Sequence, residues 1–287
     1  MARRPIAEEP VSRLAIWARR MALFSLAAAL LSIIIVRSGL LEIGPALATF
    51  AGALACAVIA LVLALAAFVM VWKDGLRGLG YSLGAIAIGL ALLAYPAYLG
   101  LKAYKLPHIH DITTDSIDPP RYEVLARIRP RNANSVNYEG LTVAQAQHAA
   151  YPEIEPLEED AAPQAAFTAV LSVINKRRWL IVDQRPPQPP RREGRIEAVA
   201  RTPIMGFRDD VVVRVRPTED GSRIDLRSSS RYGAFDFGTN ATRIRALLDD
   251  IDEAIGALKP DQPERPIAPA PKKSKGTGKG GQPPAKR

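Results

Sequence analysis

The N-terminal third of the chain contains three long stretches without a charged residue, and hydrophobic residues fill most of their positions. They cover residues 21–36, 43–72 and 78–101. About 20 apolar residues cross a hydrocarbon core of roughly 30 Å, so the second and third stretches are long enough to span a membrane. The first spans only if it continues past Arg37, whose side chain would then reach the interface. We therefore predict three transmembrane helices within residues 21–101, at 21–41, 45–72 and 79–101, after a cytoplasmic segment of residues 1–20.

Three features of these stretches narrow the class of membrane protein. The second and third contain no ionisable residue, whereas pumps and transporters usually need one inside the membrane. A cleaved signal peptide is an alternative for the first stretch, although the tripeptide that resembles a cleavage site, at residues 46–48, lies far beyond it. Small residues at a spacing of four in the second stretch predict close packing against another helix: Ala48, Gly52, Cys56, Ala60 and Ala64.

Residues 107–258 have the pattern of a soluble domain. Residues 107–120 resemble an extended linker that ends in two prolines. Apolar residues at helical spacing predict one helix over residues 161–178, capped by Asp160, and another from Asn240, as its cap, to Leu258. Short β-branched or alternating segments at 179–182, 195–201, 211–216 and 223–228 predict strands, and Asp220-Gly221 supplies a turn between the last two. We expect an α+β domain: an antiparallel sheet with two helices on one face, preceded by the three transmembrane α-helices.

Charge is distributed unevenly along the chain. The formal net charge is +9, but residues 107–258 contain 20 Lys and Arg residues against 23 Asp and Glu residues. The basic excess therefore lies in the flanks, and the acidic balance of the domain argues against nucleic acid as a partner. Residues 259–287 are rich in Pro, Lys and Gly and lack aromatic residues, which predicts a disordered basic tail. The only cysteine, Cys56, excludes an intrachain disulfide and a cysteine-based metal site.

Arginines gather on the sheet face opposite the helices. Alternation places six arginines and two acids there: Arg195, Glu197, Arg201, Arg214, Arg216, Arg223, Asp225 and Arg227. This face is either a solvated surface with weak ion pairs or an anion-binding face, since guanidinium groups suit phosphate and carboxylate.

A Gly- and Ser-rich stretch follows the last predicted strand and leads into the last helix. Exposed backbone amides and the helix dipole favour anions at such a position, although the same stretch could be a purely structural loop with Asp236 and Asn240 as caps. The candidate anion-binding residues are Arg214, Arg227, Ser228, Ser230, Arg231, Asn240 and Arg243.

Signals for catalysis are weaker. His108, His110 and Asp111 could provide part of a metal site, but no third ligand at a defined spacing accompanies the histidine pair. A nucleophilic Ser228 or Ser230 would need a base, and no histidine is near them in the sequence. Asp209 and Asp210 are neighbours on a strand and point to opposite faces, so they do not form an acid–base pair. The sequence therefore predicts no catalytic residue and no cofactor.

Several motifs together resemble the domain-of-unknown-function family 1499 of bacterial and plastid proteins. The matching segments are residues 109–115 (Ile-His-Asp-Ile-Thr-Thr-Asp), 118–120 (Asp-Pro-Pro), 151–152 (Tyr-Pro), 195–198 (Arg-Ile-Glu-Ala), 209–216 and 227–245. The resemblance covers residues 107–258 and implies an α+β extracytoplasmic domain, often with membrane segments, and no established activity. Some members carry a paired-cysteine motif near the start of the domain, which this sequence lacks.

These observations favour a membrane-anchored domain that binds or scaffolds an anionic envelope ligand. The alternative is an envelope enzyme that uses a metal held by His108 and His110. The expected partners are the lipid bilayer and an anionic lipid or envelope glycan. The expected location is the bacterial cytoplasmic (inner) membrane, with several spans, the N-terminus in the cytoplasm and the C-terminal domain in the periplasm.

The charges that flank the predicted spans make this orientation testable. Seven Lys and Arg residues lie before the first span or just after the second, against three on the other side, and the more basic side is usually cytoplasmic. A phosphatase reporter fused after Leu258 should be active, and a fluorescent reporter that matures only in the cytoplasm should stay dark. The reverse pattern would place the domain in the cytoplasm.

Overall fold

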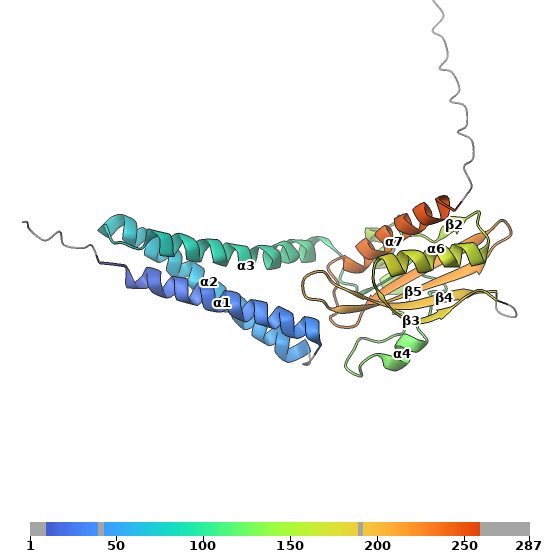
Figure 1. Ribbon diagram of the computed structural model, residues 1–287, viewed down its shortest axis with the longest axis horizontal. Helices are drawn as coiled ribbons and strands as arrows, with labels where there is room; N and C mark the ends of the chain where they lie inside the picture. The colour runs from blue at the N-terminus through green and yellow to red at the C-terminus, as the bar shows by residue number, and fades with distance from the viewer. Residues whose placement is uncertain (1–9, 40–42, 189–191, 259–287) are drawn as a thin grey trace, which may run out of the picture.

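The computed structural model describes residues 10–39, 43–188 and 192–258, which form a bundle of three long helices and an α+β domain (Figure 1). The predicted basic tail lies outside the described residues, as do the first nine residues of the predicted cytoplasmic segment.

The three N-terminal helices are α1 (Arg13–Ser38), α2 (Ile43–Asp74) and α3 (Leu79–Lys105), and each is long and apolar enough to cross a membrane. Helix α1 begins earlier than predicted, and the Ser12 hydroxyl at its start accepts a hydrogen bond from the backbone N of Ala15. It ends at Gly39, whose φ of 68° is accessible to glycine. Because the helices alternate in direction, the end of α1, the start of α2 and the end of α3 lie nearest the domain (Figure 1).

Alanine side chains form the contact between these helices. The buried face of α2 consists of Ala46, Ala53, Ala57, Ala60, Ala64, Ala67 and Val71. The predicted stripe is therefore only partly right, because Ala60 and Ala64 are buried while Ala48 and Gly52 are exposed. A spacing of four drifts around a helix that has 3.6 residues per turn, whereas the alternating steps of three and four seen here keep one face in contact.

The domain contains one antiparallel sheet. Its strands are β1 (Asp111–Thr113), β2 (Leu157–Glu159), β3 (Leu180–Arg185), β4 (Gly194–Arg201), β5 (Arg208–Pro217) and β6 (Ser222–Ser230). The order is β1-β6-β5-β4-β3, and β2 pairs with the same edge of β6 further along. The three predicted alternating strands are confirmed as β4, β5 and β6. The run at 179–182 also forms a strand, β3, which lies at the edge of the sheet.

Helices α6 (Pro163–Lys176) and α7 (Thr239–Gly256) cover one face of this sheet, which confirms the predicted layers (Figure 1). Alternate residues of the strands face them and are buried: Ile196, Ala198, Val211, Val213, Val215, Ile224 and Leu226. Neither predicted side-chain cap is present. Helix α6 starts after Ala162 without a side-chain cap, and Asn240 lies inside the first turn of α7 rather than before it.

The opposite face of the sheet is covered as well, which corrects the expectation of a solvated surface. Residues 115–138, which we call the covering segment, lie over it and include the short helix α4 (Val124–Ile128). They bury Tyr122 and Leu125 against Val199 and Val212. The carboxylate of Glu197 is fully buried and accepts hydrogen bonds from the backbone N atoms of residues 123, 124 and 125, at 2.7, 3.3 and 2.8 Å. A buried carboxylate thus satisfies the free amides at the start of α4.

The segment predicted as a linker is also part of the fold. It contains β1, whose Asp111 and Thr113 pair with Ser229 and Arg227 of β6. Helix α5 (Leu141–Ala150) holds this strand from the other side, because the Gln147 side chain bonds the backbone N and O of Thr113 at 3.0 and 2.7 Å. The domain therefore starts almost immediately after α3.

The loop between β4 and β5, residues 202–207, contacts the end of α1 and the start of α2. Met205 packs with Val36 and Ala46 in a small apolar cluster. The Arg37 guanidinium at the end of α1 donates from Nη1 to the carbonyl oxygens of Pro203 and Ile204, at 2.7 and 3.0 Å. This loop lies beside the end of the helix bundle.

The turn between β5 and β6 leaves no room for a side chain. A Cβ atom at Gly221 would lie 2.1 Å from the backbone O of Glu159 and 3.0 Å from the backbone N of Ala161. Gly221→Ala should therefore destabilise the domain by about 1–3 kcal/mol through overpacking. The matched control is Gly256→Ala in α7, where a Cβ meets open space and alanine is the better helix former. Thermal unfolding of the full-length protein in detergent, followed by near-UV circular dichroism, compares them. Equal midpoints for the two variants would contradict the close approach.

Candidate functional site

Four of the candidate residues come together where β6 approaches the first turn of α7. The Ser228 hydroxyl donates to Oδ1 of Asn240 at 2.7 Å, and the Asn240 amide donates to Oγ of Ser230 at 3.0 Å. Nη1 of Arg243 donates to Oγ of Ser228 at 2.9 Å. The anion that Arg243 binds is a side chain of the same domain, because Nη2 of Arg243 contacts Oδ2 of Asp209 at 2.5 Å.

Arg227 lies on the opposite face of the sheet and is only 2% exposed. It pairs with Asp111 through both Nε and Nη2, at 3.0 and 2.6 Å. Its guanidinium carbon lies 4.7 Å from the ring centre of Tyr122 and 5.5 Å from that of Tyr138. The carboxylate neutralises the charge of Arg227, and two aromatic rings contact its guanidinium group.

Arg214 is buried in the same layer. Its guanidinium donates to Asp225 at 3.0 Å and to Asp118 at 2.9 Å. The predicted arginine-rich face is therefore neutralised by carboxylates from β6 and from the covering segment. The structure places internal carboxylates against Arg214, Arg227 and Arg243, where the sequence suggested an external anion.

Arg231 differs from these three. Its Nε and Nη2 contact Oδ1 of Asp210, at 2.8 and 2.7 Å, but Arg129 also binds this carboxylate, through Oδ2 at 2.7 Å. One negative charge is thus shared by two positive ones. Asp209 and Asp210 serve opposite faces, as their adjacency predicts, and both form ion pairs.

Burial shifts several pKa values in this network. Burial raises the pKa of Asp209 above its usual range, against the opposing charge of Arg243. It also raises the pKa of Asp236, although the backbone N–H groups of Asn240 and Gly238 donate to that carboxylate. Burial would raise the pKa of Asp115 too, but the backbone N–H of Asp118 and the guanidinium of Arg223 outweigh it and hold that pKa below its usual range.

The alternative metal site receives no support from geometry. His108 is exposed and its ring lies 4.6 Å from that of Phe235, whereas His110 is buried. The Asp111 carboxylate binds Arg227. Among the described residues, no group of three or more His, Cys, Asp or Glu side chains is arranged to hold a metal ion.

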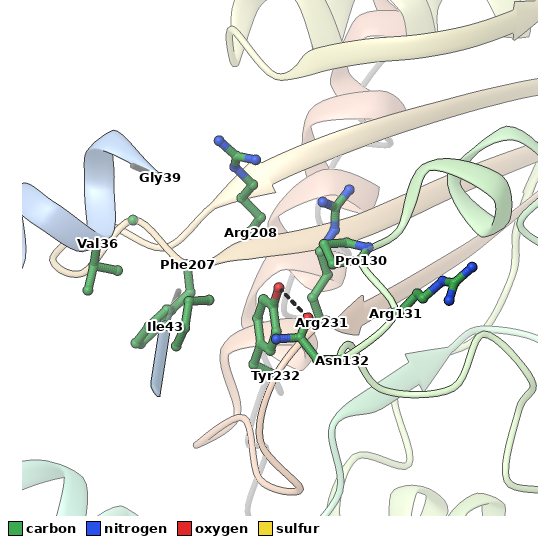
Figure 2. Close-up of a pocket in the computed structure, with 11 residues that line it drawn as sticks. Val36, Gly39, Ile43, Pro130, Arg131, Asn132, Phe207, Arg208, Arg231 and Tyr232 are labelled. Carbon is green, nitrogen blue, oxygen red and sulfur yellow. Dashed lines mark hydrogen bonds between the residues drawn. The ribbon is translucent and has the colours of Figure 1, made fainter. Parts of the chain in front are cut away.

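Two adjoining pockets lie at the end of the domain beside the helix bundle, and each has a volume of about 710 Å³. The first is lined by residues at the end of α1, the start of α2 and the start of β5, and by segments 130–132 and 231–232 (Figure 2). The second lies beside the start of β3. Arg208 and Arg231 line both pockets, and no acidic residue of the described ranges lines either of them.

We name the exposed arginines of these pockets the membrane-proximal basic surface: Arg131, Arg178, Arg201 and Arg208. Within the described part of the chain, Arg131, Arg178 and Arg208 form no ion pair, and Arg201 donates only to the backbone O of Arg37, at 3.3 Å. Of the predicted site residues, only Arg231 reaches this surface. The sequence singled out Arg201 as part of the arginine-rich sheet face. It offered no signal for Arg131, Arg178 or Arg208, because composition does not show which arginines lack a carboxylate partner in the fold.

The Arg227–Asp111 pair should be essential for stability. Arg227→Met leaves a buried carboxylate without a partner, which costs about 3–5 kcal/mol. The double variant Arg227→Met with Asp111→Leu removes both charges and should recover much of that loss. Arg245 forms a pair with Glu153 at the surface, so Arg245→Met should cost no more than about 1 kcal/mol. Chemical unfolding of the full-length protein in detergent tests the set. Equal losses for Arg227→Met and Arg245→Met would contradict the structural role.

Comparison with known proteins identifies the domain. A family described as protein of unknown function (DUF1499) matches residues 111–251. No curated relative matches the chain. The matched region runs from β1 into the last turns of α7 and thus includes the ion-paired layer, while the three helices precede it. The chain therefore belongs to the DUF1499 family and carries its domain behind three apolar helices that are long enough to cross a membrane.

Proposed function

We propose that this protein is a binding or scaffolding protein of the bacterial cell envelope. In this proposal the three helices anchor it in the cytoplasmic membrane with the N-terminus inside, and the DUF1499 domain lies in the periplasm. Its ligand is an anionic component of the envelope, such as a lipid or a glycan. The membrane-proximal basic surface takes this ligand.

The observation that carries this proposal is the contrast between paired and unpaired arginines. Arg214, Arg227 and Arg243, inside the domain, contact carboxylates at 3.0 Å or less. The arginines of the membrane-proximal basic surface have no such partner among the described residues. Exposed guanidinium groups without a carboxylate attract phosphate and carboxylate groups of other molecules.

The location of the surface supports the same function. The Arg37 guanidinium and the loop between β4 and β5 hold this end of the domain against the helix bundle. An anionic ligand bound here would lie close to the membrane surface. The positive charge would also increase the rate at which anionic ligands associate, in a manner that falls with ionic strength.

Binding of a soluble polyanion tests the proposal. Full-length protein in phosphatidylcholine nanodiscs should bind fluorescent inorganic polyphosphate in an anisotropy titration, more weakly at high salt. Arg178→Gln with Arg201→Gln should weaken binding severalfold. Arg121→Gln is the control, because Arg121 is also exposed but lies on the covering segment and lines neither of the two pockets. The basic tail contributes equally to every variant, so the difference between variants reports on the surface. Equal affinities for the surface variant and the control would contradict the proposal.

A further inference from the structure

The first pocket combines an apolar floor with a basic wall. Val36 of α1, Ile43 of α2 and Phe207 of the loop between β4 and β5 form the apolar part, and they lie together in Figure 2. Arg208 and Arg231 line the other part, and Arg131 lies at the rim, with its guanidinium turned away from Phe207 (Figure 2). We infer that this pocket binds one anionic phospholipid, with its phosphate on the arginines and the start of its acyl chains on the apolar floor.

The depth of the pocket in the membrane fits a lipid headgroup. Val36 is the last apolar residue before Arg37, and the Arg37 side chain turns back to the carbonyl groups of the loop. Charged side chains at the end of a span lie at the interface, so this position marks the border of the hydrocarbon core. Met205 packs beside Val36 at that border. The pocket therefore opens where headgroups meet acyl chains.

Arg208 and Arg231 are placed as a pair. Arg208 opens β5 and Arg231 follows β6, and the register that pairs Asp209 with Ser230 makes them neighbours on one face. A Cβ atom at Gly39 would lie 2.9 Å from Nη2 of Arg208, so this guanidinium reaches the end of α1. Arg208 can offer a fork of donors to a phosphate, and Arg231, whose Nε and Nη2 contact Asp210, can add a hydrogen bond from Nη1.

The positive charge around the pocket is only partly compensated by the described residues. Arg208 has no ion pair within the described residues, and Arg231 shares the single charge of Asp210 with Arg129. Among the described residues, no acidic side chain lines the pocket. Its volume of about 710 Å³ falls within the range of roughly 300–1,000 Å³ that is usual for small-ligand sites. An amphipathic anion matches both halves of this lining, whereas a free phosphate ester would leave the apolar half uncovered.

This inference rests on the proposed function, because it names the ligand class for one part of the same surface. Native mass spectrometry of the full-length protein in neutral detergent tests it, with phosphatidylglycerol, phosphatidylcholine or sn-glycerol 3-phosphate as the added probe. The wild-type protein should retain one phosphatidylglycerol at least about tenfold more strongly than phosphatidylcholine, since only the former carries net charge. sn-Glycerol 3-phosphate should not displace the lipid at equal concentration.

Variants assign the binding to the pocket. Arg208→Gln should weaken phosphatidylglycerol binding by about tenfold or more, and Arg208→Lys by less, because lysine keeps the charge but loses the fork. Arg121→Gln should bind like the wild type. If Arg208→Gln lowers the thermal midpoint, Arg131→Gln at the exposed rim replaces it and should weaken binding in the same direction.

The possible failures point to different conclusions. Equal binding of the two lipids, unchanged binding in both arginine variants, or full displacement by sn-glycerol 3-phosphate would each overturn the lipid site. Polyphosphate binding that still depends on Arg178 and Arg201 would then leave the proposed function intact. If polyphosphate binding does not depend on Arg178 and Arg201 while lipid binding is retained, the proposed function is overturned and the lipid site is not.

Discussion

Pairing of buried arginines with carboxylates from distant parts of the chain is the constraint on which the domain depends. A guanidinium group removed from water is strongly destabilising unless a carboxylate and further hydrogen bonds accompany it. Arg227 obtains Asp111 from β1, and Arg214 obtains Asp118 from the covering segment and Asp225 from β6. The sheet therefore needs the segment that precedes it, and that segment is ordered because the sheet supplies the positive charges.

The same requirement leaves several exposed arginines without a carboxylate. Four of them gather beside the end of α1, the start of α2 and the start of β3: Arg131, Arg178, Arg201 and Arg208. Contact between the loop at residues 202–207 and the helices turns this end toward the bundle. The basic surface is thus a consequence of how the fold distributes its acids, and not of a basic sequence motif.

Sequence patterns predicted the elements that bury one apolar face. Strict alternation indicated β4, β5 and β6, and helical spacing indicated α6 and α7, because the sheet and the helices share a core of aliphatic side chains. Residues 115–138 escaped prediction because they are polar, contain only a five-residue helix and are fixed by ion pairs rather than by periodic apolar contacts. The candidate site likewise combines residues that are close in sequence with one that only the fold brings near. Proximity in sequence brought Ser228, Ser230, Asn240 and Arg243 together, but Asp209 approaches them only through pairing of β5 with β6.

Pairing of the first strand with the last has a consequence for how the protein is made. β1 follows soon after α3, and the strand with which it pairs, β6, comes last among the described strands. Contacts between residues so far apart in the chain form late and slowly. Before β5 and β6 emerge, Asp111, Asp115 and Asp118 have none of their arginine partners and remain hydrated. The sheet and its layer of buried ion pairs can therefore close only after nearly the whole domain has been synthesised.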